Sequence, residues 1–266
     1  MRGHTPSRLG GIDVRQEDRA PFDRALRHAR VAAYAPGGFV GQESFMTAGE
    51  IRTLARHAGV GPGTKVLDLC CGIAGPGRLL ARELGCELLG VDASASAVAI
   101  AREQAGDLPC SFAVAKVPPL PAGPFDVVLL LETMLAFEDK DALIGEIAAA
   151  LRPGGRFAFT LEEGQPLTGE EREAMPDADT VWLTPLDEMA ASLERAGLVL
   201  TWREDHSLVH RLQAQALTEA FAADAEGIAA QIGRRALEEL LAAHRLWIEW
   251  LGRGRVRKLA LVAESA

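Results

Sequence analysis

The stretch from Val66 to Gly77 constrains the fold more than any other part of the chain. It reads Val-Leu-Asp-Leu-Cys-Cys-Gly-Ile-Ala-Gly-Pro-Gly, a short apolar strand followed by a turn of small residues. A helix-forming run from Arg78 to Leu84 follows directly. In open α/β folds this order brings bare backbone and the positive end of a helix close to a bound ligand. We therefore expect a nucleotide-like cofactor at this turn.

A second strand points to the same kind of ligand. The run from Cys86 to Asp92 is apolar and ends in a carboxylate, and a helical run from Ser96 to Gln104 follows it. A carboxylate at the tip of the second strand can accept hydrogen bonds from both ribose hydroxyls, whereas it would repel a ribose phosphate. Asp92 is therefore expected to hold an unphosphorylated ribose.

The chain then keeps alternating helices and strands. Apolar runs at Ser111 to Ala115, Phe125 to Leu131 and Phe157 to Leu161 are separated by helical runs at Ala95 to Ala105 and Lys140 to Leu151. Such alternation predicts parallel strands with right-handed crossovers and helices on both faces. The expected fold class is α/β, with a doubly wound, Rossmann-like, mostly parallel sheet.

The last third of the chain departs from this alternation. A helix over Pro185 to Ala196 and a strand over Leu198 to Arg203 are followed by two helices, Leu208 to Ala223 and Gly227 to Leu251, before a strand at Val256 to Ala263. The final two strands can be neighbours only if the helical pair is an insertion over the carboxyl ends of the sheet, where ligands bind. We expect an antiparallel last strand and a helical lid over residues 207–251.

The 266 residues, 48% of them hydrophobic, can bury one large core, so a single domain is expected over residues 21–266. Residues 1–20 are polar, contain Gly and Pro and are predicted to be a flexible tail. Helices are expected over 21–58, and Thr47 with Glu50 forms a capping-box pattern.

Charge and cysteine content narrow the partners. The formal net charge of −9 argues against a nucleic-acid backbone as the main partner. The four cysteines, at 70, 71, 86 and 110, lack metal-ligand spacing, so no metal is expected and Cys70 and Cys71 are interpreted as small packing residues. There is no export signal and no apolar run long enough for a membrane, so the chain is expected in the cytoplasm. The oligomeric state is left open.

Four motifs stand in a fixed order, namely Val66 to Ala74, Gly90 to Ser94, Phe125 to Val128 and Leu151 to Gly155. Together they make residues 60 to 163 resemble the class I S-adenosylmethionine-dependent methyltransferases. The resemblance implies that the cofactor is S-adenosylmethionine and that the reaction is an in-line transfer of its methyl group.

The nearest branch acts on small molecules and includes sarcosine and natural-product methyltransferases. Leu131 to Asp139 resembles the L-E-S-x-H-H-x-x-D pattern of that branch without its two histidines, and Phe39 to Gln42 also looks like this branch. The resemblance implies a small-molecule substrate.

Two departures from the family concern the cofactor. Cys70 and Ala74 stand where the family has glycines. Lys116 stands where the family commonly has an acid that receives the adenine amino group, and a lysine cannot accept that hydrogen bond. The adenine is then held by Val117 and backbone groups, or the cofactor binds weakly.

The resemblance implies that Asp68 and the turn after it position the methionine end of the cofactor. It also assigns the ribose to Asp92 and the methionine amino group to the backbone of Glu132. The residues expected to bind the cofactor are Asp68, Cys70, Gly72, Ala74, Gly75, Asp92, Ala93, Lys116, Val117, Glu132 and Gln42.

A base is needed only if the acceptor atom carries a proton. The candidates for proton transfer are Glu132, His206, His210 and His244, and the spacing of His206 and His210 predicts one shared helix face. The alternative for each histidine, which the composition of folded proteins favours, is an ordinary surface or packing residue. The residues expected to contact substrate are Tyr34, Phe39, Met134, Trp182 and Trp247.

The leading hypothesis is a methyltransferase acting on a small, fairly apolar metabolite. A second hypothesis keeps the cofactor but assigns a cyclisation or rearrangement to the pocket. A third is an NAD-dependent oxidoreductase, because Gly72 to Gly77 also fits a G-x-A-x-x-G loop, and a fourth is a binding module without catalysis. The acceptor atom, whether N, O, C or S, is set by pocket shape and stays open.

Overall fold

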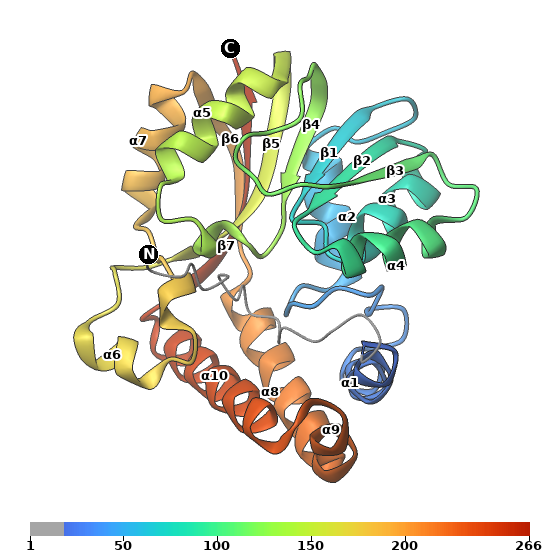
Figure 1. The fold of residues 1–266 in the computed structure, drawn as a ribbon. Helices are drawn as coiled ribbons and strands as arrows, with labels where there is room; N and C mark the ends of the chain where they lie inside the picture. The colour runs from blue at the N-terminus through green and yellow to red at the C-terminus, as the bar shows by residue number, and fades with distance from the viewer. Residues whose placement is uncertain (1–18) are drawn as a thin grey trace, which may run out of the picture.

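A seven-stranded sheet forms the centre of the computed structural model, which describes residues 19–266 and, in α1, side chains from residue 24 onward. The strand order is β3-β2-β1-β4-β5-β7-β6 (Figure 1). The strands are β1 (Lys65–Leu69), β2 (Glu87–Asp92), β3 (Cys110–Val114), β4 (Phe125–Leu130), β5 (Leu151–Glu163), β6 (Leu198–Asp205) and β7 (Arg257–Ser265).

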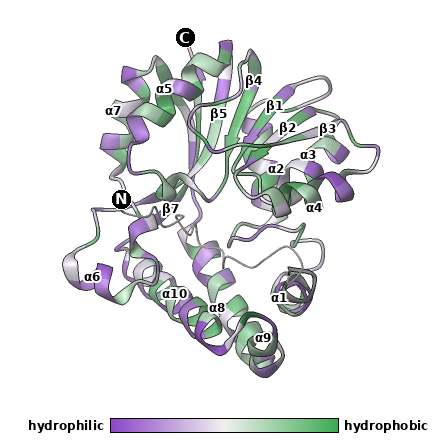
Figure 2. Ribbon diagram, in the orientation of Figure 1, coloured by the Kyte–Doolittle hydropathy of each residue, from purple (hydrophilic) through white to green (hydrophobic). Residues whose placement is uncertain are grey.

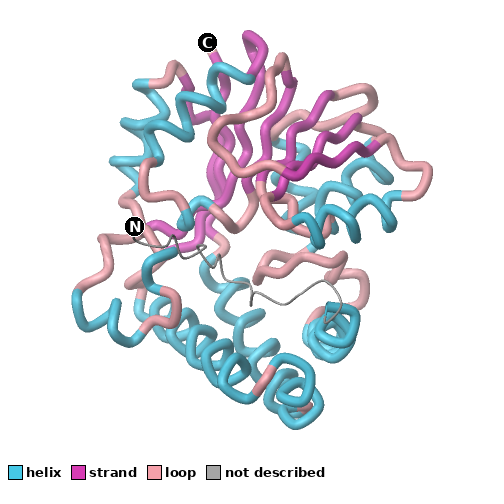
Figure 3. Tube along the Cα trace, in the orientation of Figure 1, coloured by secondary structure: helices cyan, strands magenta, loops and turns pink. Residues whose placement is uncertain are grey.

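Helices surround this sheet on both faces and beyond its carboxyl ends (Figure 3). The helices are α1 (Arg19–Ala33), α2 (Ala48–His57), α3 (Gly75–Leu84), α4 (Ala95–Ala105), α5 (Lys140–Ala150), α6 (Gly169–Ala174), α7 (Leu186–Arg195), α8 (Ser207–Ala223), α9 (Ala225–Ile232) and α10 (Arg234–Arg253), with short 3₁₀ turns η2 (Met134–Ala136) and η3 (Ala178–Thr180).

The last strand alone runs against the others. β7 pairs antiparallel with β5 on one side and β6 on the other, while the remaining strand pairs are parallel. The predicted α/β fold, with a mostly parallel sheet and an antiparallel last strand, is confirmed.

Two apolar cores fill the spaces between the sheet and the helices. On one face α2, α3 and α4 contribute Ile51, Leu80 and Val98 to a buried cluster. On the other face α5 and α7 contribute Ile144 and Met189. Figure 2 shows the strands mostly green, while the helices around them carry both colours. This amphipathic pattern is what binds a helix layer to a sheet face.

A third layer of helices lies below the sheet in Figure 1. It consists of α1, α8, α9 and α10, and its own apolar cluster includes Leu26, Leu217, Phe221 and Leu237. We call these four helices the helical layer. The chain enters α8 from the end of β6 and returns to the sheet at β7, so the predicted insertion between the last two strands is present.

Several element boundaries differ from the prediction. The single helix expected over Gly227 to Leu251 is two helices, α9 and α10, because Gly233 has a φ of +88° that breaks the helical path. β5 begins at Leu151, before the expected Phe157, and α6 was not expected.

The tail predicted over residues 1–20 lies outside the described residues except for its last two, Arg19 and Ala20, which begin α1. Among residues 19–266, no helix has the length and apolar character needed to cross a membrane.

Candidate active site

The turn after β1 has a strained backbone. Cys70, Gly72 and Ala74 have φ values of 55°, 54° and 57°, in the left-handed region, and Ala74 is the residue from which α3 starts. The amide of Cys71 donates to the Val91 carbonyl (3.1 Å), which ties the turn to β2. A left-handed conformation costs a non-glycine residue roughly 1–2 kcal/mol, and such strain is typical of functional sites. The two replaced glycines therefore keep a glycine-like backbone.

Asp92, at the end of β2, lies against this turn. One of its carboxylate oxygens accepts a hydrogen bond from the Gly72 amide and the other accepts one from the Ser94 amide, both at 2.8 Å. A Cβ added at Gly72 would meet no atom within 4 Å. The turn is thus open on the side where a ligand would lie, and Ala93 beside Asp92 is exposed.

Asp68, the last acid of β1, is buried beneath the turn. Burial, reinforced by the nearby charge of Asp92, raises the pKa of Asp68 to about 7. A Cβ added at Gly77 would lie 2.7 Å from an Asp68 oxygen, so α3 can approach β1 closely only with glycine there.

A loop between α1 and α2 forms the neighbouring wall. Gln42 is buried in it, where the side-chain oxygen accepts from the Val40 amide (2.7 Å) and the side-chain nitrogen donates to the Gly38 and Met46 carbonyls. A Cβ added at Gly75 would lie 2.4 Å from the Val40 carbonyl oxygen. Gln42 therefore shapes the loop that packs on the start of α3, and its amide groups are directed into that loop.

The two residues predicted to lie near the adenine, in the segment after β3, have different surroundings. Lys116 is exposed and Val117 is buried. This arrangement leaves Val117 as the apolar contact and places Lys116 toward solvent.

Glu132 follows β4 with a φ of +62°. Its amide donates to the Thr160 hydroxyl (2.6 Å), and one carboxylate oxygen lies 2.7 Å from the Lys258 ammonium. Lys258 also pairs with Glu162, its register partner across β5 and β7. Burial alone would lower the pKa of Lys258, but the carboxylates of Glu132 and Glu162 outweigh it and raise this pKa. Glu132 is therefore held as a buried carboxylate.

Glu50, His206 and His210 meet beside Glu132, and we call these three residues the Glu–His cluster. Glu50 Oε1 lies 3.0 Å from His206 Nδ1 and 3.2 Å from His210 Nε2. His210 Nδ1 lies 3.8 Å from a Glu132 oxygen. Two of the predicted histidines thus come together with Glu132.

Local structure explains why these three side chains converge. Glu50 sits in the first turn of α2, where its Oε2 closes the predicted capping box by accepting from the amide and hydroxyl of Thr47. His206 precedes α8 and His210 lies one turn later. All three side chains are buried.

Electrostatics keeps the cluster carboxylate ionised. Burial alone would raise the pKa of Glu50, but the adjacent imidazoles of His206 and His210 outweigh it and hold the pKa well below its usual range. Burial likewise opposes protonation of His206, yet Glu50 and Glu204 together raise its pKa.

His244, on α10, is next to the cluster but outside it. Its ring meets Phe45 and Phe221 edge-on, at centroid distances of 5.1 and 5.5 Å, and Phe45 also lies 6.3 Å from the ring of His210. Its Nδ1 lies 2.8 Å from the Leu240 carbonyl oxygen, and burial lowers its pKa to about 4. His244 is therefore neutral near pH 7.

Among the residues predicted to contact substrate, Tyr34 and Phe39 lie against each other at 5.5 Å. The Tyr34 hydroxyl donates to the Ser44 carbonyl, and burial together with the charge of Glu132 raises its pKa. Met134 is completely buried in the core of the face covered by α5, so its position does not support the predicted contact.

The two predicted tryptophans lie farther along the chain. Trp182 donates to the Asp179 carbonyl (3.1 Å), and the Arg172 guanidinium lies 4.9 Å from its ring. Trp247 meets Trp250 edge-on at 5.4 Å. Both rings therefore have protein partners.

Two comparisons with known proteins identify the family. Residues 66–155 match the family model described as "Methyltransferase domain". The chain is 32% identical to methyltransferase GfsG of Streptomyces halstedii over 189 residues, which are 65% of this chain and 67% of that protein. The chain belongs to the class I S-adenosylmethionine-dependent methyltransferases. This excludes the nicotinamide-dependent alternative.

Two other relatives match this chain over less than half of their own length. The methyltransferase is 33% identical over 150 residues to the 2-methyl-6-phytyl-1,4-hydroquinone methyltransferase of Synechocystis sp., and these residues are 52% of this chain but 47% of that protein. It is 34% identical over 125 residues to phosphoethanolamine N-methyltransferase 3 of Arabidopsis thaliana, 44% of this chain and 26% of that protein.

Solved structures show the same fold over nearly the whole chain. A putative sarcosine dimethylglycine methyltransferase from Galdieria sulphuraria has a TM-score of 0.76 at 17% identity and covers 94% of this chain and 98% of its own. The [4+2]-cyclase SpnF has a TM-score of 0.71 at 21% identity and covers 93% of both chains. At such identities the likeness concerns the fold alone.

The residues around the turn fit S-adenosylmethionine. The space above Gly72 is open, and the Asp92 carboxylate beside it suits a ligand that carries hydroxyl donors or positive charge. When bound, this cofactor supplies a methyl group on a positively charged sulfur. The thiols of Cys70 and Cys71 have pKa values raised mainly by burial, in agreement with a packing role.

Sequence reasoning missed Lys258, Glu162 and the part that Glu50 plays beyond its helix cap. A signal exists for Lys258, because it is a charged residue in the apolar run that forms β7. Glu162 likewise follows the apolar end of β5. Pairing of β5 with β7 brings both charges opposite each other, and the sequence alone does not give that register.

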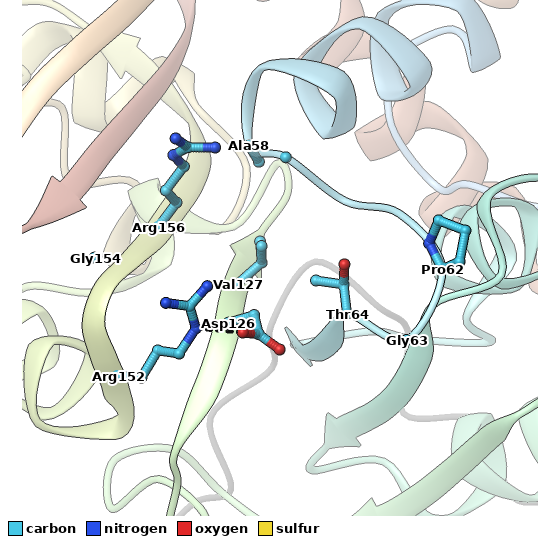
Figure 4. Close-up of a pocket in the computed structure, with 10 residues that line it drawn as sticks. Ala58, Pro62, Gly63, Thr64, Asp126, Val127, Arg152, Gly154 and Arg156 are labelled. Atoms are coloured by element: carbon cyan, nitrogen blue, oxygen red, sulfur yellow. Dashed lines mark hydrogen bonds and ion pairs between the residues drawn. The ribbon is translucent and has the colours of Figure 1, made fainter.

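A separate cavity lies at the opposite edge of the sheet (Figure 4). Its lining includes Thr64, Asp126, Arg152 and Arg156, at the amino ends of β1, β4 and β5. Arg152 pairs with Asp126 and Arg156 with Glu264. Ligands in this fold bind at the carboxyl ends, so this cavity is not part of the candidate active site.

Proposed function

We propose that this methyltransferase methylates a small, fairly apolar metabolite at an atom that carries a proton. The observation that supports the proposal is the Glu–His cluster, buried beside Glu132 at the carboxyl end of β4. A methyl acceptor that loses a proton needs nearby groups that compensate the change of charge. Buried carboxylate and imidazole side chains are suited to that task.

In this proposal the turn after β1 holds the methionine end of the cofactor, with Asp68 beneath it. Asp92 accepts from the ribose hydroxyls through the lone pairs that its two backbone hydrogen bonds leave free. Val117 contacts the adenine and the backbone of Glu132 receives the methionine amino group. Gln42 acts indirectly, through the loop that packs on Gly75.

The helical layer supplies the cover. Because α8 carries His210 and packs against α1 and α10, residues 207–251 serve as the lid that excludes water from the acceptor. Tyr34, Phe39 and Phe45 line the same region beside the cluster. This apolar lining supports a substrate that is itself fairly apolar, such as a natural product made and methylated in the cytoplasm.

The acceptor atom follows from the pocket and not from the family. Relatives are named for methylating phosphoethanolamine at nitrogen and a sterol at carbon 24. The Glu–His cluster favours an acceptor with an O–H or N–H bond.

The test is a comparison of His210→Gln with the parent enzyme. Using methyl-labelled cofactor and a metabolite extract, we expect transfer to small molecules to fall by about 10²–10⁴-fold, the usual contribution of a group that handles the acceptor proton. Cofactor affinity, measured by calorimetry, should stay unchanged. The matched control is His57→Gln, since His57 is exposed and stacked on Trp202 away from the cluster.

Label on protein or nucleic acid alone would contradict the small-molecule substrate. Full transfer by His210→Gln would contradict the role of the cluster. A converted substrate without release of the demethylated cofactor would favour the alternative of a cyclisation or rearrangement, which the shared fold with a [4+2]-cyclase keeps relevant.

A further inference from the structure

The Glu–His cluster contains three ligand atoms that face one another without hydrogen bonds. Glu50 Oε1, His206 Nδ1 and His210 Nε2 lie within 4.8 Å of one another. Each belongs to a side chain that is nine-tenths or more buried, and none finds a hydrogen-bond partner among residues 19–266. Buried polar atoms without a partner are costly, so their convergence calls for a ligand.

The separations fit either a hydrogen bond or coordination to one ion, and the directions of the ring N–H bonds favour coordination. The oxygen of Glu50 is 3.0 and 3.2 Å from the two imidazole nitrogens, yet the ring N–H directions do not meet the oxygen. Two ligand atoms bound at about 2.1 Å to one ion are about 3.0–3.4 Å apart at angles between a right angle and the tetrahedral angle. Both measured separations lie in that range.

The far side of Glu50 is held by hydrogen bonds and that of His206 faces a carboxylate, whereas the far nitrogen of His210 makes no hydrogen bond to the described part of the chain. Glu50 Oε2 is fixed by the amide and hydroxyl of Thr47, at 2.7 and 2.8 Å, which leaves Oε1 as the single free oxygen. His206 Nε2 lies 3.3 Å from a Glu204 oxygen, and His210 Nδ1 lies 3.8 Å from a Glu132 oxygen. A carboxylate behind a metal-binding imidazole usually fixes its tautomer and orientation, and His206 has one within hydrogen-bond distance.

We propose that Glu50, His206 and His210 bind one divalent transition-metal ion through two imidazole nitrogens and one carboxylate oxygen. Two nitrogen donors favour an ion such as Zn²⁺ over Mg²⁺, which prefers oxygen. The sequence-based expectation of no metal considered the cysteines, and this site contains none. The sequence does not reveal this site, because the helix cap of α2 and the start of α8 are far apart in the sequence and come together only in the folded chain.

The role of such an ion rests on the proposed function. Three protein ligands leave a coordination position for another molecule, as in catalytic metal sites. An acceptor oxygen bound there, beside Glu132, would have its pKa lowered by the ion. The ion would then be the part of the cluster that prepares the acceptor.

Metal binding is tested directly on the full chain. The protein is stripped with a chelator, then titrated with Zn²⁺ by calorimetry and with Co²⁺ by visible absorption. We expect one equivalent per chain, with a Co²⁺ spectrum that lacks the thiolate charge-transfer band. Glu50→Gln and His206→Gln should each weaken binding by more than about 100-fold, since even residues behind the ligands contribute 10–100-fold.

Two further variants sharpen the result. Glu204→Gln should weaken binding by roughly 10-fold, and His57→Gln should leave it unchanged. Circular dichroism checks that each variant is folded. Glu50→Gln keeps an oxygen for the Thr47 cap, which protects α2.

The metal site would be overturned if the folded parent showed no saturable binding. It would also be overturned if both ligand variants bound metal with the affinity of the parent, or if the Co²⁺ spectrum showed a thiolate band. Methyl transfer by chelated enzyme with no metal bound would refute the role of the ion in the reaction while leaving the proposed function intact. Metal binding as expected, without any methylated product, would support the metal site and contradict the proposed function.

Discussion

At the scale of single residues, His244 provides a test of how burial alters titration. Its pKa is lowered to about 4 by burial, below the ordinary value near 6.5. Between these values the unfolded chain binds the extra proton and the folded chain does not, so stability falls as the pH drops through this window. The shift corresponds to about 3 kcal/mol in total.

We expect the free energy of unfolding, measured in urea, to fall more steeply between pH 6.5 and pH 4 in the parent than in His244→Leu. The variant lacks the titrating group, so the difference between the two curves isolates its effect from those of the carboxylates. Parallel curves would show that the His244 ring takes up a proton in the folded protein as readily as in the unfolded one.

At the scale of elements, the contact between the loop before α2 and the start of α3 determines where that loop lies beside the cofactor turn. A Cβ at Gly75 would lie 2.4 Å from the Val40 carbonyl oxygen and 2.7 Å from the Gly41 carbonyl carbon, both of them backbone atoms that cannot move away cheaply. Gly75→Ala should therefore displace the loop and weaken cofactor binding by about 10-fold or more, at a stability cost of about 1–3 kcal/mol.

Calorimetric titration with the demethylated cofactor measures this effect. Gly145→Ala is the matched control, because a Cβ at that helical glycine meets nothing within 4 Å. Equal affinities for parent and Gly75→Ala would mean that the loop is not part of the cofactor wall.

Strands and helices were predictable where the pattern is local. The apolar runs of β1, β2 and β4, and the capping box at Thr47, give the correct element with boundaries close to those observed. The break at Gly233 was not predictable, because an isolated glycine inside a helical pattern can also be tolerated within a continuous helix.

The candidate site was predictable only in part, because some of its contacts depend on tertiary packing and not on local sequence patterns. Motif residues such as Asp92 lie at the tips of strands, and their position follows from the fold class. The meeting of Glu50 with His206 depends on α2 and the start of α8 both lying against β7, and nothing near either residue in the sequence encodes that contact. The left-handed conformation of Glu132 is likewise a product of its surroundings.

At the scale of the whole molecule, separate cores imply separate stabilities. The helical layer has its own smaller apolar cluster, whereas the sheet lies between two larger ones. Regions with fewer buried apolar contacts open at lower free energy. We expect amides of α8, α9 and α10 to exchange hydrogen faster than those of β1, β4 and β5, and to be slowed when the demethylated cofactor is added.

Hydrogen exchange followed by mass spectrometry measures both effects. Exchange of the helical layer in step with the central strands would show one cooperative unit. Faster exchange without any response to the cofactor would show that the layer opens independently of the site.

The neighbouring positions of β6 and β7 have a consequence for how such chains diversify. The register pairs Asp205 with Leu259, and the His206 amide donates to the Lys258 carbonyl, so the intervening helices leave and rejoin the sheet at one point. A segment attached this way can lengthen, shorten or be replaced as a cassette without changing the strand order. New substrate ranges can thus arise by replacing one contiguous gene segment, while the strands and turns that bind the cofactor stay unchanged.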